Sequence, residues 1–310
     1  MVVKVSINVL NYNTYAKSKK CIDSCLRQKQ VEYRVLLVDN NSTDDSFEKL
    51  KTEYGDTIEY LQTGHNFGYA KGNNIAVEKC VKDGYRYSLL LNSDTELVDD
   101  TVLSKLTLIM TSNANCVIVA PTVYDVTSKG LVLQPNDSLY LKWLRWGRIL
   151  PKIQRITPNI ELINEAHGSA LLVDGVSFLK VGGFPEHYFM YDEECTLAKK
   201  IQWNKGLILW HRDDNSYVLH HHDISGSIEP WRLCLKGRNF SLEFWENYDK
   251  NHICWLFIYI LYILNTFKNS IISNNYHLLK GMFIGFKEHV KKITPEQIFA
   301  EGLKIRESYK

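Results

Sequence analysis

The chain has 310 residues, of which 45% are hydrophobic and 23% are charged, as is typical of a globular protein large enough for one big α/β domain or two smaller units. Its formal net charge of +2 at pH 7 gives no overall case for nucleic-acid binding, so any basic function must be local. The seven cysteines are odd in number and never spaced C-x-x-C, which indicates neither a disulfide framework nor a zinc site. This cysteine usage fits a reducing cytoplasm.

The ends of the chain give expectations about membranes. The N-terminus leads straight into a strand-like stretch at residues 4–10, so we expect no secretory signal. The longest apolar run, residues 253–264, has twelve residues, fewer than the roughly 18–20 that cross a bilayer. We therefore expect a cytoplasmic protein without a membrane span.

Short apolar stretches alternate with helical patterns in the first part of the chain. This alternation predicts a mostly parallel sheet flanked by helices. The expected strands are 4–10, 33–38, 58–62 and 87–91, and the expected helices are 16–28, 46–54, 72–83 and 101–111.

The second part of the chain continues the sheet and ends in helices. Residues 140–156 carry basic and aromatic side chains without any acid, which indicates an excursion or lid. No repeat or low-complexity linker separates the halves, so we expect them to share one core. The remaining expected elements are strands at 116–121 and 169–173, a strand-like stretch at 217–219, a helix at 193–204 and an amphipathic helical tail after Arg238.

Asp39 closes the second expected strand and is followed by turn-forming residues 40–44. Such a segment is either a plain strand-to-helix loop or the place where an acid contacts a nucleotide base or ribose. Segment 66–74 spaces Gly68 and Gly72 four apart among asparagines, beside Lys71. It is either an isolated Gly/Asn turn or a loop whose backbone approaches a phosphate before a helix.

Asp94 follows the apolar run 87–91, which places a carboxylate at the carboxyl edge of the sheet. Mg²⁺ or Mn²⁺ bound there would bridge this carboxylate to a diphosphate, with weak help from Asn92. The structural alternative is that the segment from Asn92 to Thr95 caps a helix beginning near Val98.

Glu193 and Glu194 follow an aromatic cluster, so one of them can have its pKa raised toward that of a general base, or both can lie in a solvated helix start. His220, His221 and His222 end a strand-like stretch. Because alternate side chains of a strand share a face, His220 and His222 are expected to face one site, unless they are structural.

These blocks, in this order, resemble the family 2 glycosyltransferases of GT-A fold, particularly the rhamnosyltransferase-like bacterial members that build surface polysaccharides. The resemblance covers residues 4–240 and is carried by segments 7–13, 39–44, 66–73, 91–95 and 182–194. It implies a nucleotide-sugar half at 1–115, an acceptor-binding and catalytic half at 116–240 of the same GT-A domain, and a helical extension at 241–310.

The resemblance also implies residue roles. It implies that Asp39 contacts the base, that Asp94 holds the metal with His222 as a looser second ligand, and that Glu194, or less securely Glu193, is the catalytic base. Two departures are Asn92, where many relatives carry an acid, and Glu194, where many carry Asp. The implied donor-binding residues are Asn11, Asp39, Asn66, Gly68, Lys71, Asn73, Asn92 and Asp94.

The expected reaction is an inverting, metal-dependent transfer from dTDP-rhamnose or a UDP-sugar to a saccharide or polyprenyl-diphosphate-linked acceptor. Residues 268–310 carry eight Lys or Arg against four Glu. This tail predicts peripheral contact with the inner face of the cell membrane, or packing within the protein or in a homodimer. The rival functions are a sugar-phosphate nucleotidyltransferase and a catalytically lapsed nucleotide-sugar-binding subunit.

Overall fold

The computed structural model describes residues 3–134, 136, 142, 152–221, 229–246 and 253–309. The chain divides into two compact units. Unit 1 comprises Met1–Asn136, Ile153–Phe184 and Leu197–Ile224, and unit 2 comprises Asp137–Lys152, Pro185–Thr196 and Ser225–Lys310. Each unit has a hydrophobic cluster of its own.

The strands that the structure describes all lie in unit 1. They are β1 (Lys4–Asn11), β2 (Glu32–Asp39), β3 (Glu59–Gln62), β4 (Tyr87–Asn92), β5 (Thr95–Leu97), β6 (Cys116–Ala120), β7 (Val123–Thr127), β8 (Gly130–Leu133), β9 (Gln154–Thr157), β10 (Ile160–Leu162), β11 (Ala170–Asp174), β12 (Leu207–His211) and β13 (Val218–His220). The helices of this unit are α1 (Tyr15–Cys25), α2 (Ser46–Tyr54), the short 3-10 turn η1 (Gly55–Thr57), α3 (Gly68–Lys82), α4 (Val102–Ser112), α6 (Gly175–Lys180) and most of α7 (Glu193–Trp203).

A nine-stranded sheet in the order β3-β2-β1-β4-β11-β6-β12-β10-β9 forms the centre of unit 1. The first four strands in this order are parallel to one another, whereas β11 runs antiparallel to both β4 and β6. The predicted α/β architecture is confirmed, and β6 and β12 form a further parallel pair in the same sheet.

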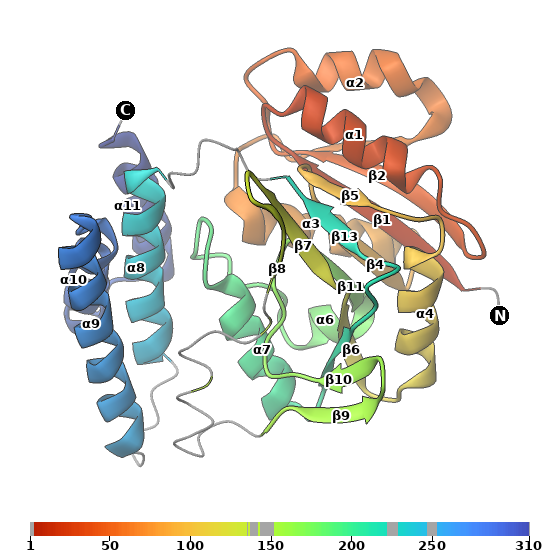
Figure 1. Ribbon diagram of the computed structural model, residues 1–310. Helices are drawn as coiled ribbons and strands as arrows, with labels where there is room; N and C mark the ends of the chain where they lie inside the picture. The colour runs from red at the N-terminus through yellow and green to blue at the C-terminus, as the bar shows by residue number, and fades with distance from the viewer. Residues whose placement is uncertain are drawn as a thin grey trace. The chain divides into compact units, whose positions relative to one another are not determined.

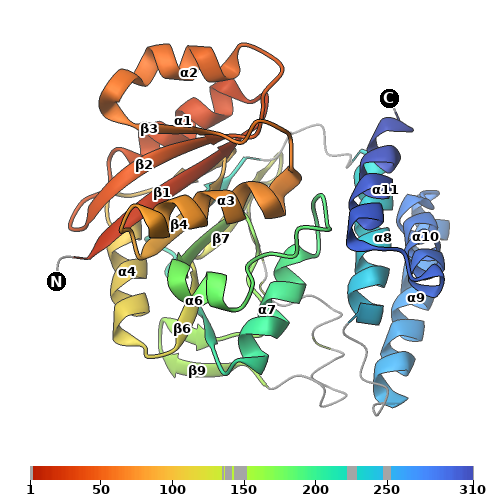
Figure 2. The ribbon, with the colours of Figure 1, turned by 180° about the vertical axis from the view of Figure 1, so that it is seen from behind.

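Helices cover both faces of this sheet (Figures 1 and 2). Leu89 and Leu91 of β4 belong to the buried cluster that includes residues of α1, α2 and α4, while Leu90 belongs to the cluster of α3, α6 and α7. Successive side chains of a strand point to opposite faces, so a strand covered on both faces is apolar throughout. The continuous run in β4 therefore follows from its central position.

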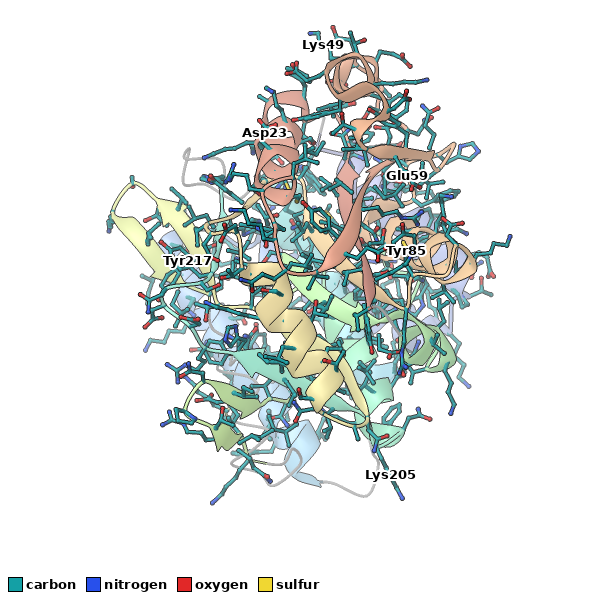
Figure 3. The ribbon with its side chains drawn as sticks, turned by 90° about the vertical axis from the view of Figure 1, so that its right-hand side faces the viewer. Asp23, Lys49, Glu59, Tyr85, Lys205 and Tyr217 are labelled. Carbon is teal, nitrogen blue, oxygen red and sulfur yellow. The ribbon has the colours of Figure 1, made fainter. Side chains whose placement is uncertain are left out.

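Arg34 fastens the β3 edge of the sheet. Its guanidinium pairs with Glu59 at 2.7 Å and with Asp83 at 2.8 Å, and it lies 4.1 Å from the ring centre of Tyr85 (Figure 3 labels Glu59 and Tyr85). A planar guanidinium makes several such contacts at once. These contacts join β2 to the strand beside it and to the end of α3.

A second, four-stranded sheet in the order β5-β13-β7-β8 adjoins the carboxyl end of β4. The sequence did not predict β5, β7, β8, β9, β10 or β12, which have three to five residues each. The structural alternative of a helix cap at Asn92–Thr95 is excluded, because Thr95 begins β5 and the next helix, α4, starts only at Val102.

Unit 2 contains the helices α8 (Pro230–Glu246), α9 (Ile253–Ser273), α10 (His277–Lys291) and α11 (Pro295–Glu307). The expected boundary at residue 241 falls inside α8. Gly237 of α8 and Gly281 of α10 have no room for a Cβ, since each backbone lies directly against the other helix. Most of the basic segment 140–156 lies outside the described residues.

The helix α9 is longer than the apolar run predicted from sequence. It has 21 residues, and its stretch Leu256–Ser273 is long and apolar enough to cross a membrane, with 22% of that stretch buried in the structure. The length argument against a membrane span therefore does not hold.

Candidate active site

Polar side chains meet at the carboxyl ends of β1, β2 and β4, as the sequence predicted. These three strands are parallel neighbours, and their registers place Asn11 beside Asp39 and Leu10 beside Asn92. Ligands of open α/β sheets bind at this edge. The edge therefore provides the candidate active site.

Asp39 is buried and hydrogen-bonded at both carboxylate oxygens. Its Oδ1 accepts from Asn11 Nδ2 at 2.8 Å and from Ser42 Oγ at 2.6 Å, and its Oδ2 accepts from the backbone N–H of Ser42 at 3.0 Å. The side chain of Asn11 has no exposed surface, because its amide oxygen also accepts from Thr14 and Ser18. Asn11 therefore orients Asp39, and its direct contact with the donor stays a prediction.

Asn40 organises the segment around Asn66, a role that sequence reasoning missed. Its Nδ2 donates to Asn66 Oδ1 at 3.1 Å and to the carbonyl of Gly68 at 2.9 Å, and its Oδ1 accepts from the backbone N–H of Phe67. Gly68 has a φ of +74°, which favours glycine, and it begins α3. Asn66 and Gly68 are thus brought together beside the carboxyl end of β2.

The predicted phosphate loop ends earlier than expected, because Gly72, Asn73 and Asn74 lie inside α3. Asn73 is buried and donates to the carbonyl of Tyr69 at 3.0 Å, and its contact with the donor stays a prediction. Lys71 is half-buried in the first turn of α3, with its Nζ 4.7 Å from the ring centre of Phe67.

Asn74 ties α3 to the glycine turn that precedes Pro185. Its Oδ1 accepts from the backbone N–H of Phe184 at 3.0 Å, and its Nδ2 donates to the carbonyl of the same residue at 2.9 Å. Gly183 lies beside this amide with a φ of +57°. The asparagine that looked like part of a donor loop is therefore structural.

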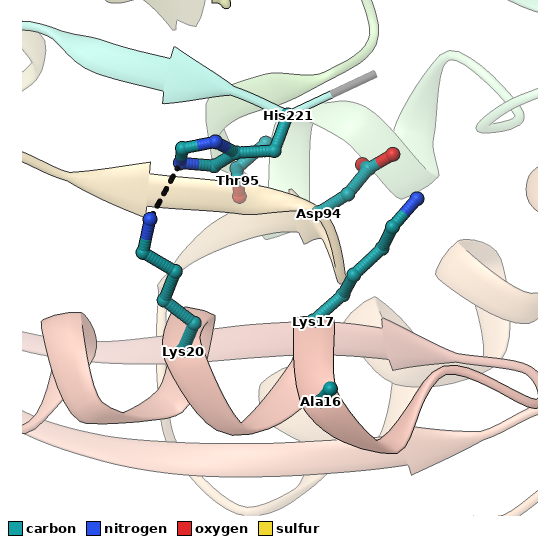
Figure 4. A pocket seen from close by; sticks show the side chains of 6 residues that line it. All are labelled: Ala16, Lys17, Lys20, Asp94, Thr95 and His221. Carbon is teal, nitrogen blue, oxygen red and sulfur yellow. Dashed lines mark hydrogen bonds between the residues drawn. The ribbon is translucent and has the colours of Figure 1, made fainter. Parts of the chain in front are cut away.

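Asp94 lies in the turn between β4 and β5. Its backbone carbonyl accepts from the N–H of His221 at 2.7 Å, and its side chain is 23% exposed. Asn92 ends β4, and its carbonyl accepts from Thr95 Oγ1 at 2.8 Å. A pocket of about 220 Å³ opens at this turn (Figure 4), lined by Ala16, Lys17, Lys20, Asp94, Thr95 and His221.

His220 is a buried residue of β13 and connects Asp94 to Asp125. Its Nε2 lies 3.2 Å from Asp94 Oδ1, and its Nδ1 lies 3.1 Å from Asp125 Oδ1. Burial by itself would lower the pKa of His220, but hydrogen bonds to Asp125 and Asp94 outweigh burial and raise that pKa to about 9. An imidazolium between two carboxylates is the consequence.

Further polar groups support this arrangement from behind. Gln134 Nε2 donates to Asp125 Oδ1 at 2.6 Å, and Ser169 Oγ donates to Gln134 Oε1 at 3.0 Å. The sequence predicted that His220 and His222 share one face of a strand. His222 lies outside the described residues. The alternation did not reveal that His220 contacts Asp94.

The α1 side of the pocket carries lysines, and one of them, Lys20, is paired with an acid. Lys20 Nζ lies 2.9 Å from Glu96 Oε2, and His221 Nε2 lies 3.0 Å from the same oxygen. Burial would raise the pKa of Glu96, but the hydrogen bonds from Lys20 and His221 lower it overall. Figure 4 shows the side chain of Lys17 extending from α1 toward the carboxylate of Asp94.

Glu193 and Glu194 begin α7, in the part of that helix that belongs to unit 2. Burial, with the charge of Glu194, raises the pKa of Glu193 well above its usual range. Among the described residues, none is a hydrogen-bond partner of Glu193 Oε2, whereas Glu194 is only partly buried. The two acids thus have different environments, which the sequence left undecided.

The surroundings of Asp94 fit a hard divalent cation that is shared with a diphosphate. Mg²⁺ is typically held by one or two carboxylates, with phosphate oxygens and waters completing the shell. Asp94 is a half-buried carboxylate on a pocket and is oriented by His220. In the part of the chain that the structure describes, no cluster of three or more His, Cys, Asp or Glu could hold a metal alone.

Comparisons with known proteins identify a family and relatives for this chain. The model of glycosyl transferase family 2 matches residues 6–176. The low-salt glycan biosynthesis hexosyltransferase Agl10 of Haloferax volcanii is 26% identical over 210 residues, which cover 66% of this chain and 65% of that protein.

Two solved structures show the same fold. The mannosyltransferase of Pyrobaculum calidifontis in complex with GDP-Man and Mn²⁺ has a TM-score of 0.58 at 12% identity, covering 100% of this chain and 76% of that one. GalNAc-T7 with UDP, GalNAc and Mn²⁺ has a TM-score of 0.61 at 12% identity, covering 80% and 49%. At these identities the likeness shows the fold alone, and it confirms the predicted GT-A fold.

The chain spans slightly less than two thirds of Agl10 and about half of GalNAc-T7. The family model, in contrast, covers more than half of the 310 residues. This chain therefore belongs to glycosyl transferase family 2.

Proposed function

We propose that this chain transfers a sugar from a nucleoside-diphosphate donor to a saccharide acceptor in the synthesis of a surface glycan. The observation that supports the proposal most is Asp94, a carboxylate on a pocket at the carboxyl edge of the sheet, oriented by a buried histidine. Nucleotide ligands bind at this edge in open α/β sheets. Membership of family 2 supports the same reading.

The donor's nucleoside would lie over Asp39 and the segment of Asn66 and Gly68. Asp39 is held in place by Asn11, and Asn66 is held by Asn40, so the two sides of this subsite are rigid. Lys71 follows in the first turn of α3, where its charge would favour an anionic ligand. Rigid side chains keep the cost of ordering low when the nucleotide binds.

Asp94 would hold a Mg²⁺ or Mn²⁺ ion, and His222 remains a proposed second ligand. When bound, such an ion stabilises the negative charge that develops on the departing nucleoside diphosphate. His220 would fix the orientation of the Asp94 carboxylate, as residues behind metal ligands commonly do.

Glu194 would act as the base. It removes the proton of the acceptor hydroxyl while that oxygen forms a bond to the anomeric carbon and the bond from this carbon to the diphosphate oxygen breaks. One displacement of this kind inverts the anomeric configuration. Glu193 suits the role less, because burial raises its pKa well above the usual range and so favours the protonated form, which cannot accept a proton.

The proposed donor and acceptor come from the similarity of this chain to known glycosyltransferases. The sequence favours dTDP-rhamnose or a UDP-sugar, while the solved relatives were bound to UDP or GDP-Man. A polyprenyl-diphosphate-linked saccharide is the proposed acceptor.

The test is to incubate the protein with UDP-, dTDP- and GDP-sugars, Mn²⁺ and a lipid-linked acceptor, and to identify the products by mass spectrometry. A glycosylated acceptor and free nucleoside diphosphate, with inverted anomeric configuration, are expected. Pyrophosphate released from a nucleoside triphosphate would indicate a nucleotidyltransferase instead. Donor binding without turnover under every condition would indicate a lapsed binding subunit.

A further inference from the structure

The helix α9 in unit 2 exposes a row of large apolar side chains. Leu264 is 57% exposed, Phe267 48% and Ile271 54%, and Ile260 lies one turn earlier at 45%. Residues spaced by three or four share one side of a helix. An exposed apolar row of this length usually marks a surface that binds something.

The neighbouring helix α10 also has an outward apolar side, and it is bordered by lysines. Phe283 is 62% exposed and Val290 is 61% exposed. Lys280 and Lys287 are exposed three residues before and four residues after Phe283, and Lys291 is exposed one turn further. The two helices lie side by side in both views (Figures 1 and 2).

The opposite side of α9 is occupied by the core of its own unit. Tyr259 stacks on Phe244 of α8 with ring centres 4.2 Å apart and lies 2.8 Å, through its hydroxyl, from Ser241 Oγ. Ile258 joins the same buried cluster with Met282 of α10. A helix with one side in a protein core and the other exposed is suited to lie in a membrane interface rather than to cross it alone.

Such a surface could bind either a second copy of the chain or a lipid bilayer, and the charges around it distinguish the two. The helix α9 contains no acidic residue, and the one acid of α10, Glu288, is buried and paired with Arg238 at 2.7 Å. The outward side of these helices therefore presents lysines without acids. A second copy would oppose lysine to lysine, whereas an anionic lipid surface attracts them.

We propose that the outward side of α9 and α10, formed by Ile260, Leu264, Phe267, Ile271, Phe283 and Val290 and bordered by lysines, is a lipid-binding face for an anionic bilayer. This inference depends on neither the donor nor the catalytic residues. It commits the face to lipid rather than to a homodimer and to lying on the bilayer rather than spanning it.

The experiment is co-sedimentation of the full chain with vesicles of pure phosphatidylcholine and of equal parts phosphatidylcholine and phosphatidylglycerol. We expect the wild type to bind the anionic vesicles. The apolar triple variant Leu264→Ser, Phe267→Ser, Phe283→Ser should bind them with an affinity lower by about tenfold or more. The lysine triple variant Lys280→Gln, Lys287→Gln, Lys291→Gln should show a similar decrease in affinity. A triple variant of Leu108, Val176 and Trp203 to Ser is the matched control, since these unit 1 residues are also exposed at 66%, 52% and 67%. It should bind like the wild type.

Equal binding by all variants, or no binding by the wild type, would overturn the proposal. Circular dichroism confirms that each variant is folded, and the lysine variant tests the face without touching any apolar residue. Light scattering that finds a dimer dissolved by the apolar triple variant, without vesicle binding, would assign the face to a second copy. Retention in the membrane after carbonate extraction would assign α9 to a span.

Discussion

Nε2 of His220 lies 3.2 Å from Oδ1 of Asp94, and this contact joins two strands from distant parts of the chain. The register between β13 and β5 places His220 opposite Thr95, next to Asp94. The other ring nitrogen is bonded to Asp125, so the imidazole is fixed at both ends. The orientation of the proposed metal ligand therefore depends on a buried side chain.

Replacing His220 with Gln should weaken metal binding more than it affects folding. The carboxylate of Asp94 loses its orienting partner, and changes of this kind typically cost about 10- to 100-fold in metal affinity. A titration of Mn²⁺ by calorimetry, in the presence of nucleoside diphosphate, measures the effect. His277→Gln in unit 2 is the control, and an unchanged Mn²⁺ affinity in His220→Gln would contradict the positioning role.

Glu194→Gln should lower kcat by about 10²- to 10⁴-fold, because the acceptor proton loses its base. Donor binding should be nearly unchanged. Steady-state rates with saturating donor and acceptor test this, and Glu193→Gln serves as the neighbouring control, with loss of less than about tenfold expected. If Glu193→Gln proves to be the inactive variant, the assignment of the base must be exchanged.

The buried Glu193 predicts a pH dependence of stability. Its pKa is raised in the folded protein, so above its unfolded pKa the folded state retains a proton that the unfolded state releases. The contribution of Glu193 is fully present below the unfolded pKa and is lost as the pH rises through the folded pKa. Urea unfolding between pH 5 and 9 should therefore show a decline that is smaller in Glu193→Gln. Parallel curves for the two proteins would contradict this prediction.

Gly183→Ala should destabilise the protein by about 1–3 kcal/mol. The residue has a φ of +57°, and a Cβ there would lie 2.7 Å from Asn74 Oδ1, which holds Phe184. Gly130→Ala is a matched control, because Gly130 also has a positive φ, +109°, but nothing lies within 4 Å of its Cβ position. Thermal unfolding of both variants separates backbone strain from the clash. Equal losses would rule out the clash as the cause.

Features of the fold that depend on short stretches of sequence could be predicted. The run in β4 could be recognised because a strand covered on both faces is apolar throughout, and Asp94 followed from the end of that run. The three-residue strand β5 is too short to leave a pattern, so the sequence left open whether the segment after Asp94 begins a helix. The asparagines after Gly68 resembled a loop, although they lie in the interior of α3.

Contacts between distant segments could not be predicted from the sequence. The pairing of His220 with Asp94 requires the register of the second sheet, and the bonds between Asn74 and Phe184 require the packing of α3 on the glycine turn. Both depend on tertiary structure that no local spacing encodes. The different burial of Glu193 and Glu194 is of the same kind.

The central claim is that Asp94 supports metal-dependent turnover of a nucleotide sugar. The most direct measurement is nucleoside diphosphate release from a panel of UDP-, dTDP- and GDP-sugars, for wild type and Asp94→Ala, with Mg²⁺, Mn²⁺ or a chelator. We expect release from one donor that requires the metal and is abolished in Asp94→Ala. Release that persists with chelator, or that Asp94→Ala retains at the wild-type rate, would contradict the account.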